Sequence, residues 1–498
     1  MAVLIALAIA LLSTVSIASK SPHILLVVVD DLGWSDVGYH NITDLKTPNI
    51  DRLAAQGTIL ENYYVQPICS PTRSALLSGR YPIHTGLQHG VIKPTEPYGL
   101  PLDFTLLPKK LKQAGYATHM VGKWHLGFFE WEYTPLYRGF DTFYGFYNGA
   151  EDHFTHERSG ILDLHDQKEP VRNKKNEYSA HIFSERAKEI ISAHDPSKPL
   201  FLYLPFQCVH DPAQAPIRFV DMYKHIKNKL RRHYAGMVSA VDEAIGNVTQ
   251  ALQQKGLWDD TVMIFTTDNG GIPGGGGYDW PLRGHKATLW EGGVRGAAFV
   301  HSKMLKNKGS RSKELLHVTD WYPTLAALAG LDVHENGDSV PPLDGMDVWE
   351  TIATGAPSPR KEILVNIDTP SQNPLHDENL LGYEGSALRV GDMKILVGVP
   401  NITWFKPPEL GGSLGRHWWR NWRKKDRIEV ALYNITADPE ERHDMSQKLP
   451  DVVAKLRQRL DYYMSGAVPS GKKPADKQAR KTAEKKGSWG PWKEHTLY

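Results

Sequence analysis

The sequence predicts an α/β protein: a large sheet of mostly parallel strands flanked by helices, then a smaller C-terminal antiparallel sheet with a helix. Three observations support this prediction: long apolar runs without alternation, helical segments between them, and a different pattern after about residue 375. Continuous apolar runs are typical of strands buried on both faces of a parallel sheet. Strands that alternate with helices indicate a doubly wound domain.

The predicted strands of the large sheet end in polar residues. Apolar runs cover 23–29, 118–121, 200–204 and 262–267, and the polar residues after them are Asp30 and Asp31, Lys123 and His125, His210, and Asp268 and Asn269. Ligands of such sheets bind beyond the carboxyl ends of the strands. Any single polar end is also compatible with a solvated loop, but four converging ends predict a functional site at this edge.

Helix signals separate these runs. Thr47 and Pro48 are typical of a helix start, and the helix that they predict stops near Gly57. Further helices are predicted over 106–114 and 234–252, each followed by a glycine.

The chain after residue 375 predicts a smaller unit. Residues 386–390 and 393–397 flank Gly391-Asp392, which is a hairpin signal. A strand at 430–433 and a helix at about 452–463 complete an antiparallel sheet with one helix. The Lys-rich stretch 472–486 is predicted to be a solvated tail, with polyanion binding as the alternative.

The predicted organisation follows from these patterns. It consists of a signal peptide over 1–18, a large α/β domain over 19–375, a smaller α+β domain over 376–470 and a Lys-rich tail over 471–498. With 41% apolar and 23% charged residues, the composition is that of a globular protein. A formal net charge of +2 gives no support to a nucleic-acid partner.

The N-terminus predicts entry into the secretory pathway. Residues 2–12 are uninterrupted apolar, and Ser16-Ile17-Ala18 offers a small-x-small cleavage site. A membrane anchor is the alternative, but the apolar run is short for a span, and no later stretch is long enough. We expect a lysosomal or extracellular protein, with Asn-x-Thr glycosylation sites at Asn41, Asn247, Asn401 and Asn434. The helix expected around Asn247 and the strand around Asn434 make those two sites less favourable.

The chain has only two cysteines, Cys69 and Cys208. Ser70 and Pro71 after Cys69 predict a helix start, with Ser70 as the N-cap and Pro71 at the first helical position. Cys69 would then lie at a helix N-terminus, where anions are favoured, and Arg73 would point back to the same place. The alternatives for Cys69 are a small buried apolar residue and a thiolate nucleophile.

The polar strand ends describe the chemistry of the predicted site. Asp30, Asp31, Asp268 and Asn269 form a hard-oxygen set that suits Ca²⁺ or Mg²⁺. Two lysines, Lys123 and the Lys286 of a Gly-rich loop, and two histidines, His125 and His210, suit an oxyanion and the movement of protons. Sulfate and phosphate esters are the candidate substrates.

These motifs resemble a known family. Cys69-Ser-Pro71-Thr-Arg73, followed by Leu77-Ser-Gly79-Arg80, is similar to the C-x-P-x-R signature of the type I sulfatases. The resemblance extends to residues 121–127, 267–271, 290–296, 438–444 and 489–492, and it resembles most the arylsulfatase B (N-acetylgalactosamine-4-sulfatase) branch with its arylsulfatase I and J relatives. It implies an alkaline-phosphatase-like fold with a large mixed, mostly parallel sheet.

The resemblance also implies a mechanism. Cys69 would be oxidised to formylglycine by the formylglycine-generating enzyme, and Asp30, Asp31, Asp268, Asn269 and the modified residue 69 would hold one Ca²⁺. The resemblance further implies that Lys123 and Lys286 neutralise the sulfate group and that Arg73 anchors the formylglycine hydroxyl. His125 would accept the proton that triggers sulfate release, and His210, with Lys286, would protonate the leaving alcohol. The implied substrates are sulfated carbohydrates or aryl sulfates.

Some features depart from the family pattern. The chain lacks the further cysteines of the vertebrate branch, so Cys208 is predicted to be a buried free thiol. Residues 369–383 and 404–422 differ from the expected pattern, and Trp418, Trp419 and Trp422 suit either stacking on sugars or packing. Two other functions stay open: a phosphatase or phosphodiesterase, against which Cys69 argues, and an inactive relative that binds sulfated glycans, against which the intact polar set argues.

Overall fold

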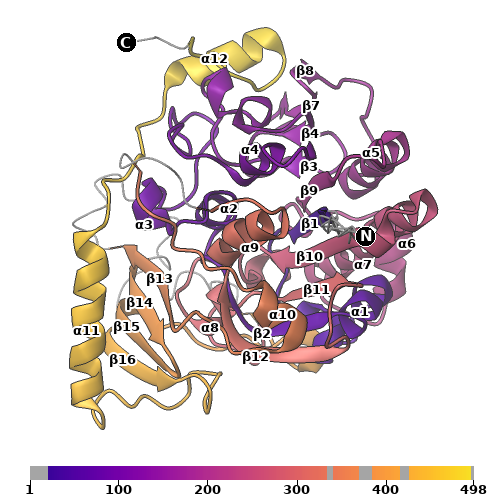
Figure 1. The fold of residues 1–498 in the computed structure, drawn as a ribbon. Coiled ribbons are helices and arrows are strands. Elements are labelled where there is room, and N and C mark those ends of the chain that lie inside the picture. The colour runs from indigo at the N-terminus through magenta and orange to yellow at the C-terminus, as the bar shows by residue number, and fades with distance from the viewer. Residues whose placement is uncertain (1–20, 334–339, 369–383, 415–425, 495–498) are drawn as a thin grey trace, which may run out of the picture.

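The computed structural model describes residues 21–333, 340–368, 384–414 and 426–494. Ten strands form one large sheet in the order β12-β2-β11-β10-β1-β9-β3-β4-β7-β8 (Figure 1). Its five central strands, from β10 to β4, are parallel, whereas β11 and β7 pair antiparallel to their neighbours. The strands are β1 (His23–Val29), β2 (Thr58–Tyr64), β3 (Ala117–Lys123), β4 (Thr142–Phe146), β7 (Leu164–Asp166), β8 (Glu169–Pro170), β9 (Leu200–Phe206), β10 (Thr261–Thr267), β11 (Ala298–Ser302) and β12 (Ser310–His317).

Both faces of the sheet are buried under helices. Along β1, Leu25, Val27 and Val29 pack into one apolar cluster, and their neighbours Ile24, Leu26 and Val28 pack into another. Continuous apolar runs therefore form central strands here because each side chain, up or down, meets a helix. The first cluster includes residues of α1 (Pro48–Ala55), α5 (Ser179–Ala193), α6 (Ile217–Val220) and α7 (Lys229–Lys255). The second includes residues of α2 (Cys69–Ser78), α4 (Leu107–Lys112), α9 (Trp321–Leu328) and α10 (Trp349–Thr354).

A four-stranded antiparallel sheet forms the smaller unit. Its strands β13 (Glu362–Asp368), β14 (Gly385–Val390), β15 (Met393–Pro400) and β16 (Arg427–Asn434) pair in chain order, and α11 (Pro450–Ser465) covers one face. In Figure 1 this unit lies at the lower left, beside β12 and α8 (Glu291–Val294). The predicted fold class and the hairpin at Gly391 are confirmed. The first strand, β13, comes from residues before position 376.

The Lys-rich stretch 472–486 is mostly exposed, as predicted, but it is folded and is not a free tail. The chain forms α12 (Lys477–Lys486), and Trp489 beyond it is only 2% exposed. The main-chain N–H of Trp489 donates to the Leu162 carbonyl, and its indole N–H donates to the Arg158 carbonyl. The lysines face solvent as expected, but long-range aromatic packing fixes the segment to the large domain.

Several sequence predictions concern surface features. The predicted signal peptide, Trp418, Trp419, Trp422 and residues 369–383 lie outside the described residues. Within the described ranges, no helix has the length and apolar character needed to cross a membrane. The sequon asparagines lie on an exposed turn (Asn41), in α7 (Asn247), after β15 (Asn401) and at the end of β16 (Asn434).

Candidate active site

The carboxyl ends of four adjacent parallel strands meet at one edge of the large sheet. Strand β1 leads to Asp30 and Asp31, β10 to Asp268 and Asn269, β3 to Lys123 and His125, and β9 to His210. The order β10-β1-β9-β3 places the three aspartates on neighbouring strands and the lysine two strands away. All the predicted strand-end residues therefore gather in one place.

Three carboxylates and Cys69 form a buried cluster with the geometry of a cation site. One ligand atom each from Asp30, Asp31, Cys69 and Asp268 lies within 4.8 Å of the others. The side-chain Oδ1 of Asn269 is buried and has no hydrogen-bond partner within the described chain, while its Nδ2 donates to Asp31 at 2.7 Å. Clustered carboxylates with an unsatisfied amide oxygen suit a hard divalent cation such as Ca²⁺.

Two buried lysines neutralise part of this charge. The Nζ of Lys123 lies 2.5 Å from Asp30 Oδ2, and the Nζ of Lys286 lies 2.6 Å from Asp31 Oδ1. Burial alone would raise the pKa of both aspartates, but these ammonium groups hold the pKa of each carboxyl below its usual value. Burial and the nearby Asp30 raise the pKa of Asp268. Arg73 and the two lysines oppose that rise without overcoming it, so the ionised form of Asp268 is the one that a further cation would stabilise.

Cys69 is the first residue of α2, not the residue before it. The N-cap is Ile68, so the predictions of Ser70 as N-cap and of Pro71 at the first helical position are wrong. The Ser70 hydroxyl instead donates to the His125 carbonyl and accepts the Ile92 N–H, so it bonds to distant parts of the chain and not to its own helix.

The surroundings of the Cys69 sulfur disfavour a thiolate. The Sγ lies 3.6 Å from Asp30 Oδ1. Burial raises the pKa of the Cys69 thiol to about 12, although Lys123 and Lys286 oppose that rise. The protein alone therefore keeps the sulfur as a neutral thiol, unlike the reactive cysteines that ionise near neutral pH.

Arg73 lies at the site but does not touch the sulfur. Its guanidinium is fully buried and donates through Nη2 and Nε to Asp268 Oδ2, at 2.9 and 3.2 Å. A third N–H donates to the carbonyl of Lys123 at 3.2 Å. Arg73 therefore joins α2 to the ends of β10 and β3, and it fixes the direction of the Asp268 carboxylate.

The two histidines are held as neutral bases. The Nε2 of His125 bonds to the Ile92 carbonyl at 3.0 Å, and its Nδ1 is buried with no partner in the described chain. Burial, Lys123 and Arg73 lower the pKa of His125 well below its usual value. His210, whose side chain is 22% exposed, has Nε2 at 3.8 Å from Asp31 Oδ2, and burial and Lys286 lower its pKa.

His153 is a further residue of this region that the sequence did not single out. Its Nε2 bonds to the His210 carbonyl at 3.0 Å, and its Nδ1 lies 2.8 Å from the Ser179 hydroxyl. It follows β4, the fifth parallel strand, whose short aromatic sequence did not stand out as a strand. The polar residues that follow β4 were the feature of the sequence that could have pointed to His153.

The loop that carries Lys286 is anchored on the smaller unit. Arg283 stacks between Trp290 and Trp404, with its guanidinium carbon 3.6 and 4.7 Å from the two ring centres. Its Nη2 donates to Asn401 Oδ1 at 2.6 Å, and Gly284 N–H donates to the Thr403 carbonyl. Lys286 is thus positioned by residues from the C-terminal part of the chain.

The fold and the site define a hydrolase of anionic esters, with oxygen ligands, cationic side chains and neutral histidines at the strand ends. A family model described as "Sulfatase" matches residues 22–331, so the chain belongs to the sulfatase family. It is 46% identical to mouse arylsulfatase J over 95% of this chain and 81% of that protein. Identity to mouse N-acetylgalactosamine-6-sulfatase is 31%, over 91% of this chain and 88% of that protein.

A solved structure supports the same conclusion. Ps i-CgsB in complex with k-i-k-neocarrahexaose superposes with a TM-score of 0.77 at 29% identity, covering 94% of this chain and 98% of that one. The predicted family, including the relationship to arylsulfatase J, is confirmed. The chain is thus a sulfuric ester hydrolase of the arylsulfatase type.

Proposed function

We propose that this sulfatase acts through a formylglycine made from Cys69 and a Ca²⁺ held by Asp30, Asp31, Asp268 and Asn269. The observation that carries the proposal is the buried cluster in which Cys69 Sγ and three aspartate oxygens lie within 4.8 Å of one another. A neutral thiol at that position has little use as a nucleophile. Oxidised residue 69 would instead offer, as the aldehyde hydrate, one hydroxyl to attack sulfur and another whose deprotonation releases sulfate. Bound Ca²⁺ would polarise a sulfate oxygen.

The side chains around the cluster would handle charge and protons. Lys123 and Lys286 pair with the aspartates beside residue 69, so their ammonium groups would neutralise charge on a sulfate group bound there. The unpartnered Nδ1 of the neutral His125 suits the acceptance of a proton from residue 69. His210 would first have to take up a proton, which the nearby Asp31 and Asp30 favour, and it would then give that proton to the leaving alcohol.

We propose sulfated carbohydrates as the natural substrates, with aryl sulfates as small model substrates. Mouse N-acetylgalactosamine-6-sulfatase is named for a sulfated sugar, and Ps i-CgsB was solved with an oligosaccharide. The proposed setting is the secretory pathway, with lysosomal or extracellular residence, modification by the formylglycine-generating enzyme, and glycosylation at the sequon asparagines.

Mass spectrometry of the residue-69 peptide tests the modification. In protein co-expressed with the formylglycine-generating enzyme, we expect a peptide in which one sulfur and two hydrogens are replaced by one oxygen. The Cys69→Ala variant should lose hydrolysis of 4-nitrocatechol sulfate. The matched Cys208→Ala variant should keep both the conversion and the activity, because Cys208 is buried beside Tyr178, outside the cluster. An unmodified thiol in fully active protein would overturn the proposal.

Removal of metal tests the cation site. After chelation and desalting we expect the activity to fall and Ca²⁺ to restore it, because crowded carboxylates lose their neutralising charge. Full activity of metal-stripped protein would contradict the proposed role of Ca²⁺ while leaving the role of residue 69 in place.

A further inference from the structure

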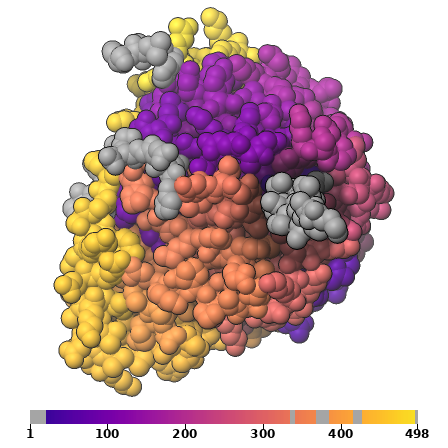
Figure 2. Space-filling model, viewed as in Figure 1, coloured from indigo at the N-terminus to yellow at the C-terminus, as the bar shows by residue number. Residues whose placement is uncertain are grey.

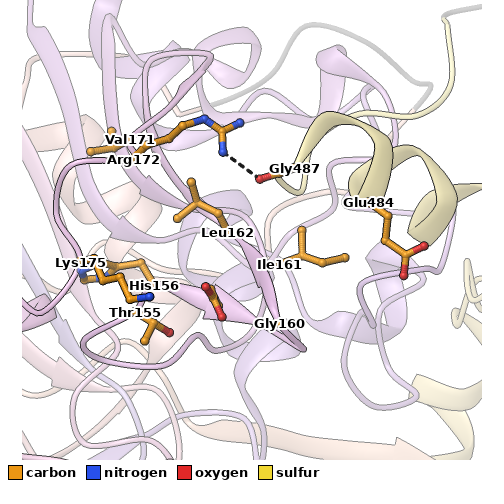
Figure 3. Close-up of a pocket in the computed structure, with 11 residues that line it drawn as sticks. Thr155, His156, Gly160, Ile161, Leu162, Val171, Arg172, Lys175, Glu484 and Gly487 are labelled. Carbon is orange, nitrogen blue, oxygen red and sulfur yellow. Dashed lines mark hydrogen bonds between the residues drawn. The ribbon is translucent and has the colours of Figure 1, made fainter.

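A surface pocket lies far from the proposed active site, where α12 meets the large domain. Its volume is about 390 Å³, and Figure 3 shows Arg172 and Lys175 on one side and α12, with Glu484 and Gly487, on the other. Ile161, Leu162 and Val171 supply apolar walls. The volume is within the usual range for sites that hold a small ligand.

Helix α12 brings a stripe of like charges to the edge of this pocket. Lys477, Lys481 and Lys485 follow one another at i, i+4 and i+8, so they share one exposed face, and none forms an ion pair with a described residue. Like charges at this spacing destabilise a helix. Glu484, three residues after Lys481, lies on the neighbouring face and lines the pocket. The stripe itself does not line the pocket, but it lies on the exposed face of the helix next to Glu484, which does.

The helix is held in place by contacts that leave these lysines free to bind. Arg172 donates to the carbonyls of Lys486 and Gly487 at the end of α12, and Asp476 caps its start by accepting the Gln478 N–H. The indole N–H of Trp492 donates to Asp476, and Trp489 is buried against the β6 strand (Ile161–Leu162). In the space-filling view, α12 lies at the top of the molecule, on its surface (Figure 2).

We propose that the α12 stripe and the adjoining pocket bind a chain of sulfated polysaccharide, outside the active site. Lys477, Lys481, Lys485 and Lys175 would contact sulfate groups, and the apolar walls would take the face of a sugar ring. This inference rests on the proposed sulfated-carbohydrate substrate and names a second contact with it.

The acidic residues of the pocket favour a saccharide over an anionic membrane. Glu157 and Glu484 also line it, and Arg480 already neutralises Glu484 at 2.8 Å. Carboxylates accept hydrogen bonds from free hydroxyls, which a sugar offers and the headgroup of phosphatidylserine lacks. Mixed charge with apolar walls therefore fits a ring that carries both sulfate and hydroxyl groups.

The position of the pocket suits a long substrate. The chain after α12 bonds to β6 and to His165 in β7, and β7 lies four strands from β1 in the sheet order. Four strand spacings correspond to roughly 19 Å. A polymer can reach across that distance, whereas a monosaccharide or an aryl sulfate cannot.

The proposal is tested by the binding of the Cys69→Ala protein to immobilised chondroitin sulfate. This variant is expected to be inactive, so binding is measured without hydrolysis. The triple variant Lys477→Gln, Lys481→Gln, Lys485→Gln should bind at least 10-fold more weakly at fixed salt. Each lost contact should also lower the salt dependence, by roughly one in the slope of log affinity against log salt. The matched control Lys227→Gln, Lys229→Gln, Lys308→Gln removes the same charge from other exposed sites and should change affinity less than 2-fold.

A kinetic comparison provides the second measurement. In the active protein, the α12 triple variant should raise KM for the polysaccharide several-fold and leave kcat/KM for 4-nitrocatechol sulfate unchanged. Equal binding by the triple variant and its control would overturn the proposal, as would tighter binding to anionic phosphatidylserine vesicles than to the polysaccharide. Absence of formylglycine would sink the proposed chemistry without affecting the binding result.

Discussion

At the residue scale, His210 is more exposed than the other polar groups of the site. Its side chain is 22% exposed, compared with 10% for Lys286 and 0% for Lys123. Substitution here leaves no buried charge unpaired, so an effect on activity can be separated from an effect on folding. It is therefore the informative position for a test of proton transfer.

We expect His210→Gln to lower kcat for a sulfated sugar by roughly 10²–10⁴. The loss for 4-nitrocatechol sulfate should be much smaller, because its phenolate departs without needing a proton. Steady-state kinetics with both substrates provide the measurement. The control is His443→Gln, an exposed histidine of the smaller unit, which should leave both rates unchanged. Equal losses for the two substrates would exclude His210 as the acid.

At the element scale, a buried ion cluster joins the two sheets. The Nζ of Lys394 in β15 lies 2.8 Å from Glu291 in α8 and 2.9 Å from Glu441, and all three side chains are 0% exposed. Tyr64 in β2 donates to the other oxygen of Glu291. Burial raises the pKa of Glu441 to about 7, although Lys394 opposes that rise. Lys394 is thus the cation that the two buried carboxyl groups share, and Arg295 lies 3.6 Å from Glu291 as a second cation for that group alone.

Lys394→Met should destabilise the protein by about 3–5 kcal/mol, because it removes the cation that both buried carboxyl groups share, and only Glu291 keeps another, Arg295. Denaturant unfolding measures the change. Adding Glu441→Gln should recover part of the loss by removing one of the charges. The exposed Lys308→Met should change stability by at most about 0.5 kcal/mol. A loss of stability below about 1 kcal/mol for Lys394→Met would show that the cluster contributes little.

The sequence predicted the elements whose patterns are local. Central strands such as β1 and β10 are apolar throughout, and α7 is amphipathic with a glycine at its end. Strands β2 and β12 were not predicted, because both lie toward one edge of the sheet and mix polar with apolar residues. The middle of β2 and the first half of β12 are only partly buried, so their apolar runs are interrupted.

The gathering of site residues was predictable because parallel strands end at one edge. What could not be predicted depends on partners distant in sequence. The Ser70 hydroxyl bonds to His125 and Ile92 and does not cap its own helix. The buried Trp489 anchors a segment whose composition is that of a free tail. Pairing of Arg283 with Trp404 across 121 positions also has no local signature.

At the scale of the whole molecule, stability is expected to depend on pH through buried acids. Burial and the nearby Glu151 raise the pKa of Asp163 to about 8. Below the unfolded value near 4, both states hold the proton. Between about 4 and 8 only the folded state holds it, so each pH unit gained costs up to about 1.4 kcal/mol of stability. The contribution of Asp163 to the free energy of unfolding is therefore most favourable in acid and becomes less favourable as the pH rises.

Asp163→Asn should remove this contribution, because an amide cannot ionise. Relative to the wild type, the variant should gain stability progressively from pH 5 to pH 8, as measured by denaturant unfolding at each pH. The exposed Asp195→Asn is the control, with a parallel pH profile to the wild type. A constant difference between Asp163→Asn and wild type across that range would show that Asp163 titrates normally.

The anchoring of Arg283 on the smaller unit has a genetic consequence. Every residue assigned to the active site lies before position 331, within the stretch that matches the family model. A premature stop codon just after that position would keep all of their codons, yet remove Asn401 and Trp404, which hold the Lys286 loop. Such an allele is expected to be null, and missense alleles at Trp404 to be partial losses of function.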